Sequence, residues 1–317
     1  MGMKSKSPCG SIRTTSNERP TGMGIFTHAI RLPCQRREWR VSIKSLMGKR
    51  SFPIKLRPDG DVRVRKLRIG RVPTLVLQPA KRPAIPVSVL WIHGGGYLTG
   101  MKEMVYMSRA MDLVKKYGVT VYSPGYRLAW QKPYPAAVED CYRVLAYLNR
   151  QPEPIMVGGE SAGGGLAAAV CMMARDRGIR VAFQMPLYPM ISNLDTESSR
   201  DNHGRVWNTR RNHLGWRLYL RGKAKERVSP YAAPANQTDY AGLPPCYTFV
   251  GDGEPFYAET LAYVENLKKA GIKAEVDVYH TDMHAFDMLR DDELSREAIK
   301  RFERHFEEAL EHTCGTS

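Results

Sequence analysis

The stretch Gly159-Glu160-Ser161-Ala162-Gly163 is the point from which the fold of this chain can be worked out. An apolar run, Ile155-Met156-Val157, precedes it, and an Ala-rich segment from Leu166 to Ala174 follows it. This order predicts a strand, a sharp turn and a helix. In a G-x-S-x-G turn the flanking glycines let the backbone close without Cβ clashes, and the serine hydroxyl points away from the sheet. Ordinary Gly/Ser-rich loops also carry such patterns, so the rest of the chain must supply the partners of a nucleophile.

Strands and helices alternate on both sides of this turn. The run Val87 to Ile92 is continuously apolar, as expected of a strand buried on both faces. The pattern predicts further strands near residues 62–69, 74–77, 119–122, 155–157, 181–185, 247–250 and 274–279, and helices near 102–117, 136–149, 166–174, 258–270 and 295–310. Ser295 is the expected N-cap of the last helix. Such alternation predicts an α/β fold with a mostly parallel central sheet and helices on both faces.

Residues 191 to 245 interrupt the alternation. They hold Trp207, Trp216 and Tyr219 among many charged residues, and their ends are rich in turn formers. An insertion of this kind between two sheet elements is a candidate lid, and its bulky aromatic side chains are expected to close a pocket.

The positive charge of the chain is concentrated at one end. The net charge is +16, and residues 1–72 contain 18 Lys and Arg against four Asp and Glu. The charge fits a solvated extension better than a nucleic-acid arm, because no nucleic-acid motif accompanies it. The 317 residues contain no apolar run long enough to span a bilayer and no signal-peptide core. Six scattered cysteines indicate reduced thiols and a cytoplasmic protein.

A serine nucleophile needs a base and a carboxylate that orients it. His284 follows the last predicted strand, where the base of such a fold belongs. His280 lies four residues earlier, but the pair sits on no helix and has no third ligand, so no metal site is expected. Asp252 and Glu254 both follow the strand at 247–250, and either could reach the imidazole.

Donors for an oxyanion are signalled by His93-Gly94-Gly95-Gly96, which follows the buried strand at 87–92. Consecutive glycines let backbone N–H groups approach a reacting carbonyl closely, and this run is the second half of the oxyanion hole in lipases and esterases. A phosphate-binding loop is the competing interpretation. The G-x-x-x-x-G-K-[ST] pattern is absent, which argues against it.

Together these motifs resemble the hormone-sensitive-lipase family of α/β-hydrolases, the HGGG-type carboxylesterases. The resemblance runs from about Leu67 to Leu310 and is carried by His93-Gly94-Gly95-Gly96-Tyr97, Tyr126-Arg127-Leu128-Ala129, Tyr134-Pro135-Ala136-Ala137, Gly159-Glu160-Ser161-Ala162-Gly163-Gly164, Ser229-Pro230-Tyr231-Ala232-Ala233-Pro234, Leu243-Pro244-Pro245 and His284-Ala285-Phe286. It implies an α/β-hydrolase fold with a helical cap. The expected organisation is a basic extension at 1–60, which contributes to the cap, and a catalytic domain at 61–317 with a cap insertion at about 191–225.

The resemblance also implies roles for single residues. The family usually carries its acid in a segment like D-P-L-R-D-E-G, and Glu254-Pro255-Phe256 fits that register, which assigns the acid to Glu254 instead of Asp252. This departs from the commoner Asp. A second departure is Gly125 and Trp130, where the family usually has D-Y-R-L-A-P-E.

The expected function is therefore hydrolysis of short-chain acyl esters without a cofactor. Ser161 is the expected nucleophile, His284 the base and Glu254 the orienting acid, with N–H groups of Gly95, Gly96 and Ala162 as the oxyanion hole. Carbohydrate acetyl esters, lactones and amides remain alternative substrates of the same mechanism. A binding protein such as the plant gibberellin receptors, which this family resembles, would lack the histidine. The expected partner is a small-molecule ester, with no nucleic acid and no membrane span, and a homodimer is left open.

Overall fold

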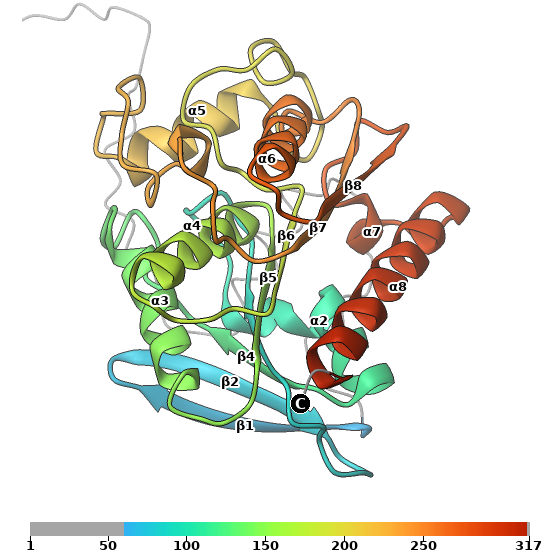
Figure 1. The fold of residues 1–317 in the computed structure, drawn as a ribbon. Coiled ribbons are helices and arrows are strands. Elements are labelled where there is room, and N and C mark those ends of the chain that lie inside the picture. Colours follow the sequence, from blue (N-terminus) through green and yellow to red (C-terminus); the bar gives the residue numbers. More distant parts are fainter. Residues whose placement is uncertain (1–59, 316–317) are drawn as a thin grey trace, which may run out of the picture.

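The computed structural model describes residues 60–315, and an eight-stranded sheet runs through them (Figure 1). The order across the sheet is β1-β2-β4-β3-β5-β6-β7-β8. Only the pairs β1/β2 and β2/β4 are antiparallel, so the predicted mostly parallel sheet is confirmed. The strands are β1 Val62–Ile69, β2 Val72–Pro79, β3 Ser88–Ile92, β4 Thr120–Pro124, β5 Ile155–Glu160, β6 Phe183–Leu187, β7 Cys246–Gly251 and β8 Ala274–Tyr279.

Helices cover both faces of this sheet, as predicted. One face carries α3, α4 and α6, whose apolar side chains pack in two adjoining clusters, and the other carries α2, α7 and α8 (Figure 1). The α-helices are α2 Arg109–Asp112, α3 Ala136–Leu148, α4 Ala162–Asp176, α5 Thr209–Tyr219, α6 Tyr257–Lys269, α7 Phe286–Leu289 and α8 Glu293–Gly315. Strands β3, β5, β6 and β7 are buried along their whole length, which explains their nearly continuous apolar sequences.

The single helix predicted near 102–117 is wrong. The segment forms a 3-10 turn at Lys102–Met107, the short helix α2, and a π turn at Leu113–Tyr117. Ser108 breaks it because its backbone is extended, and its hydroxyl accepts the Ala110 N–H as the N-cap of α2. The predicted end is correct, since Gly118 adopts the left-handed conformation that closes the turn.

The last helix also differs from its prediction. Helix α8 begins at Glu293, two residues before Ser295, and extends to Gly315. The capping oxygen belongs to Asp292, whose carboxylate accepts the Ser295 N–H at 2.9 Å, while Ser295 itself is buried inside the first turn. Strand β6 is also shifted, by two residues, from the predicted strand at 181–185. Its pairing with β5 begins at Phe183, so residues 181 and 182 lie before the strand.

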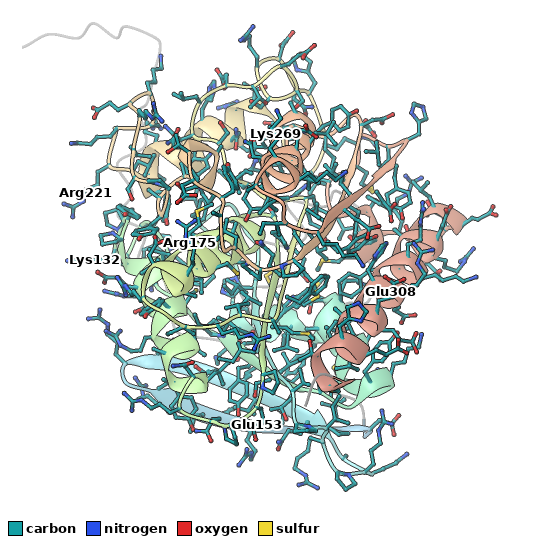
Figure 2. The ribbon with its side chains drawn as sticks, in the orientation of Figure 1. Lys132, Glu153, Arg175, Arg221, Lys269 and Glu308 are labelled. Carbon is teal, nitrogen blue, oxygen red and sulfur yellow. The ribbon has the colours of Figure 1, made fainter. Side chains whose placement is uncertain are left out.

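The segment between β6 and β7 carries α5, which lies at the opposite end of the molecule from the β1–β2 hairpin (Figure 1). The expected cap at 191–225 falls in this segment. The expected contribution of residues 1–60 concerns a stretch that, except for Gly60, lies outside the described residues. Among helices of residues 60–315, none is long and apolar enough to cross a bilayer. Charged side chains such as Lys132, Arg221 and Lys269 lie on the outer surface (Figure 2).

Candidate active site

Ser161 occupies a tight turn between β5 and α4, as the G-x-S-x-G pattern predicts. Its backbone has φ 58° and ψ −121°, a conformation that L-residues rarely adopt and that neighbouring structure must hold. A Cβ at Gly159 would lie 2.4 Å from the Ile92 carbonyl oxygen, and one at Gly163 only 2.0 Å from it. Both positions therefore require glycine so that the turn can close against the end of β3.

The structure brings Ser161, His284 and Glu254 into one chain of contacts. His284 Nε2 lies 2.9 Å from Ser161 Oγ, and His284 Nδ1 lies 2.5 Å from Glu254 Oε2. All three side chains are buried, with residue exposures of 6%, 4% and 0% for Ser161, His284 and Glu254. A proton on Nδ1 donated to the carboxylate leaves the Nε2 lone pair free to accept the serine proton.

The carboxylate of Glu254 is fixed by the turn that carries it. Its Oε1 accepts the Gly251 N–H at 2.9 Å, so the side chain folds back over the end of β7 while Oε2 faces His284. Burial raises the pKa of Glu254, whereas the imidazole and the Gly251 N–H lower it.

Asp252, the alternative acid, faces elsewhere. Its carboxylate lies 2.8 Å from Nδ1 of the exposed His280 and accepts the Thr281 N–H at 3.1 Å. His280 and His284, which are four residues apart in sequence, thus each contact a separate carboxylate. This geometry does not bring the two histidines together as ligands of one metal ion.

The glycine-rich loop after β3 lies directly against the serine turn. A Cβ on Gly94 would lie 2.9 Å from the Glu160 carbonyl oxygen and 3.3 Å from Ser161 Cβ. Gly95 and Gly96 adopt φ values of 117° and 60°, which side-chain-bearing residues avoid. Ala162 is the first residue of α4, so its N–H has no partner within the helix.

His93 supports this loop in a way that the sequence analysis missed. Its ring stacks on Tyr126 with centroids 4.2 Å apart, and the Tyr126 hydroxyl donates to the His93 carbonyl at 3.0 Å. Burial lowers the pKa of His93 to about 4, so the ring is neutral at physiological pH. The Y-R-L motif was a visible signal, but its contact with the H-G-G-G motif requires the fold.

Glu160, beside the nucleophile, contacts Trp91, which packs in the apolar cluster on the face covered by α2, α7 and α8. Its Oε1 accepts the Trp91 indole N–H at 2.8 Å, and the residue is 4% exposed. Burial raises the pKa of Glu160 to about 8, which leaves the carboxyl protonated near neutral pH. This environment gives Glu160 a structural role beside the nucleophile.

The segment between β6 and β7 covers the glycine loop. The Trp207 indole occupies the space where a Gly96 Cβ would project, at 2.0 Å from that position, and a Cβ on Gly215 would lie 3.0 Å from the Gly96 carbonyl oxygen. Trp216 and Tyr219, which were expected to close the pocket, are instead buried against Tyr97. Only Trp207 of the three predicted aromatic residues lies on the loop.

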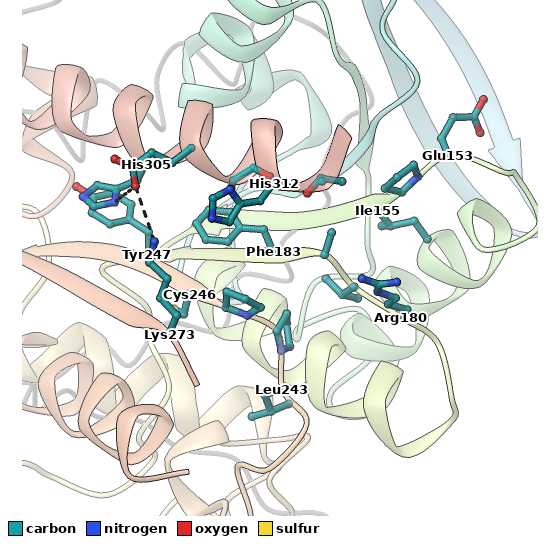
Figure 3. Close-up of a pocket in the computed structure, with 18 of the residues that line it drawn as sticks. Glu153, Ile155, Arg180, Phe183, Leu243, Cys246, Tyr247, Lys273, His305 and His312 are labelled. Atoms are coloured by element: carbon teal, nitrogen blue, oxygen red, sulfur yellow. Dashed lines mark hydrogen bonds and ion pairs between the residues drawn. The ribbon is translucent and has the colours of Figure 1, made fainter. Parts of the chain in front are cut away.

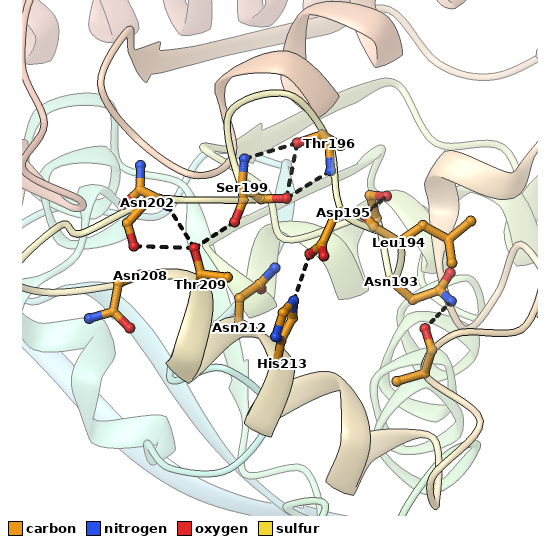
Figure 4. A network of polar contacts seen from close by, with 12 residues as sticks. Asn193, Leu194, Asp195, Thr196, Ser199, Asn202, Asn208, Thr209, Asn212 and His213 are labelled. Carbon is orange, nitrogen blue, oxygen red and sulfur yellow. Dashed lines mark hydrogen bonds and ion pairs between the residues drawn. The ribbon is translucent and has the colours of Figure 1, made fainter.

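A network of short polar side chains crosses the segment that carries Trp207 (Figure 4). The Thr209 hydroxyl donates to the Ser199 carbonyl and accepts the Asn202 N–H, both at 2.7 Å. Asn212 Oδ1 accepts the Trp207 indole N–H at 3.4 Å. The Asn202 amide also donates to the Gly253 carbonyl at 3.0 Å, which ties this segment to the turn that carries Glu254.

A hollow of about 690 Å³ lies away from these residues, at the amino ends of β5, β6 and β7 (Figure 3). Its polar side chains largely pair with one another. Lys273 lies 3.9 Å from both Glu275 and Glu308, and His305 stacks on Tyr247. Ser161, His284 and Glu254 do not line this hollow.

Comparisons with known proteins agree with the fold and the motifs. The profile of a family described as alpha/beta hydrolase fold matches residues 89–288. Solved structures similar to this chain include a bacterial heroin esterase, with TM-score 0.73 and 29% identity over 84% of this chain and 88% of that one. Another is an esterase of the bacterial hormone-sensitive lipase family, with TM-score 0.71 and 28% identity over 80% and 87%. The chain belongs to the α/β-hydrolase fold family, in its hormone-sensitive-lipase branch.

Two curated relatives match this chain over different shares of their own length. Carboxylic ester hydrolase LipN of Mycobacterium tuberculosis is 28% identical over 68% of this chain, and the match spans 61% of LipN itself. The arylesterase of Saccharolobus solfataricus is 27% identical over 80% of this chain and 84% of its own length.

Proposed function

We propose that this protein is a serine carboxylesterase that hydrolyses short-chain acyl esters without a cofactor. The observation that carries the proposal is the contact chain from Ser161 Oγ through His284 to Glu254, with distances of 2.9 and 2.5 Å. The similarity to proteins named carboxylic ester hydrolase and arylesterase supports the same reaction class.

In the proposed mechanism Ser161 attacks the ester carbonyl while His284 takes the serine proton. Glu254 keeps the imidazole oriented and stabilises its protonated form. The N–H groups of Gly95, Gly96 and Ala162 receive the negative charge of the tetrahedral intermediate. His284 then gives the proton to the departing alcohol, and a water molecule, activated by the same imidazole, releases the acid.

Short acyl chains are the proposed substrates because the site is closely covered. Ser161 and His284 are 6% and 4% exposed, and Trp207 lies on the glycine loop. We propose that residues 191–225 act as a cap that limits the length of the acyl chain.

The free thiols of Cys141, Cys171 and Cys246 support a reducing, cytoplasmic setting. A homodimer is a further proposal that the mass in solution would test.

The decisive experiment is Ser161→Ala together with covalent labelling. A fluorophosphonate probe is expected to label the wild type at Ser161, and the variant is expected to lose on the order of a millionfold in kcat while keeping its fold. Labelling at another residue, or hydrolysis that survives in a folded variant, would remove Ser161 from its role.

A further inference from the structure

A second buried carboxylate lies three residues after His284 and takes no part in the mechanism above. Asp287, in α7, has a fully buried side chain. The Tyr188 hydroxyl donates to its Oδ1 at 2.9 Å, and Arg109 Nε lies 3.1 Å from its Oδ2. Arg109 also lies 2.9 Å from Asp112, which is partly exposed. Asp287 thus connects α7 with the end of β6 and with α2.

These contacts bear on the imidazole itself. Helix α7 begins directly after Ala285, whose φ of 60° places it in the left-handed region. The Tyr188 ring that donates to Asp287 also packs edge-on against the His284 ring, with centroids 5.1 Å apart. The Phe256 ring lies at the same distance on another side. Any movement of Asp287 therefore changes the support of His284.

Packing alone does not explain why this position is ionic. A buried pair of opposite charges is often no more stabilising than apolar side chains of similar volume. Arg109 and Asp287 are both buried, and the Oδ2 of Asp287 and the Nε of Arg109 make no well-formed hydrogen bond within the described residues. The charge of Asp287 therefore contributes little to stability. Because Tyr188 connects Asp287 to the His284 ring, this charge is placed to act on the base electrostatically.

We propose that Asp287 is a positioning residue that holds His284 against Ser161 and stabilises the imidazolium formed during acyl transfer. This inference rests on the proposed function. It assigns Tyr188 and Arg109 to the same unit: Tyr188 relays the position of Asp287 to the ring, and Arg109 keeps the carboxylate ionised in its buried setting.

The charges around the imidazole come from several elements. Glu254 contacts it from the turn after β7, Asp287 in α7 is joined to it through Tyr188, and Arg109 on α2 pairs with Asp287. Burial raises the pKa of Asp287, while Arg109, Tyr188 and His284 lower it. Glu160, which interacts with both Asp287 and Arg109, is protonated near neutral pH because burial raises its pKa to about 8. Two carboxylates and one guanidinium therefore set the field in which His284 takes up its proton.

The test is the pH dependence of kcat/KM for p-nitrophenyl butyrate. Asp287→Asn keeps the shape but leaves Arg109 unpaired, so the imidazolium loses support. We expect the acid limb to move to lower pH by about half a unit or more, and kcat to fall. The double variant Arg109→Met/Asp287→Asn removes the unpaired cation. Its acid limb is expected to return part of the way, because Arg109 lies farther from the ring than Asp287.

Asp252→Asn is the matched control, since it removes an exposed carboxylate that contacts His280 instead. It is expected to leave the acid limb in place. Should Asp287→Asn not fold, the double variant carries the test alone, with a smaller shift in the same direction. Folding is checked by circular dichroism and thermal unfolding.

A second readout separates this inference from the proposed function. The ¹⁵N NMR titration of the His284 imidazole reports the same electrostatic change without any turnover. If the wild type shows no hydrolysis but the His284 titration moves to lower pH in Asp287→Asn, the esterase proposal fails and the charge coupling stands. If neither the acid limb nor the titration moves in the folded variants, Asp287 has only a structural role and the inference is overturned.

Discussion

Replacing Glu254 by glutamine is the most direct test of the proposed triad. The amide keeps the size of the side chain but removes its charge, and it can turn its NH₂ group toward His284 Nδ1. The imidazole would then carry its proton on Nε2, where it cannot accept the proton of Ser161. The analogous change in a well-studied triad lowers kcat by about 10⁴, which corresponds to about 5.4 kcal/mol. We expect a loss of this order because, within residues 60–315, Glu254 Oε2 is the hydrogen-bond partner of His284 Nδ1 and the carboxylate is fully buried.

Asp252→Asn is the control two residues away. The Asp252 side chain is 38% exposed and that of His280 is 98% exposed, so their contact is screened by solvent. An exposed pair of this kind contributes little to stability. We expect kcat to stay within about twofold of the wild type. Glu254→Asp, which withdraws the carboxylate by about one C–C bond of 1.5 Å, is expected to cost about 10²-fold.

The assay is steady-state hydrolysis of p-nitrophenyl butyrate on the pH plateau, with circular dichroism to establish that each variant is folded. Loss of activity in Asp252→Asn together with near-normal kcat in Glu254→Gln would refute the assignment of the acid. It would place the functional carboxylate two residues earlier than the structure suggests.

Two further predictions concern the cap and Glu160. Wild-type kcat/KM should be higher for acetyl to hexanoyl esters than for esters of ten carbons or more. Trp207→Ala should shift this preference toward longer chains, because it uncovers Gly96. A wild-type kcat/KM that rises with chain length would contradict the proposed cap. For Glu160, the folded pKa of about 8 lies above the ordinary 4.5. Its contribution to stability is therefore full below pH 4.5 and is lost over the interval from pH 4.5 to pH 8. The wild type should therefore lose up to about 1.4 kcal/mol of unfolding free energy per pH unit across this interval relative to Glu160→Gln, which still presents an acceptor to Trp91. Urea unfolding at pH 6 and pH 8.5 measures this difference, and parallel pH dependence in the two proteins would contradict it.

The fold could be predicted from sequence where its signals are local. The strand–turn–helix around Ser161 follows from glycines, an apolar run and an Ala-rich segment that are neighbours in the chain. His284, Asp252 and Glu254 could be nominated because each follows a predicted strand, and the carboxyl ends of parallel strands meet at one edge of the sheet. The choice of Glu254 over Asp252 came from the family resemblance.

The parts that escaped prediction depend on residues distant in sequence. Arg109 lies in α2, Tyr188 directly after β6 and Asp287 in α7, and nothing in their immediate neighbours marks them as a unit. The direction of Trp216 was also hidden, because an aromatic residue on a short amphipathic helix fits a core as well as a pocket. In the segment near 102–117 the apolar spacing suggested one helix, yet Ser108 is extended and caps a new turn.

The choice of glutamate over aspartate at the acid position has a physical explanation in the turn around Gly251. The longer side chain folds back so that Oε1 binds the Gly251 N–H while Oε2 reaches the imidazole. A Cβ on Gly251 would lie 2.4 Å from the Thr281 carbonyl oxygen, which requires glycine at this position, and 3.1 Å from Glu254 Cγ, so a side chain there would also crowd the retracted path. An aspartate on the same backbone is one methylene too short to make both contacts. The extra methylene of Glu254 is therefore taken up in the turn, where it lets one carboxylate bind both the Gly251 N–H and the His284 imidazole.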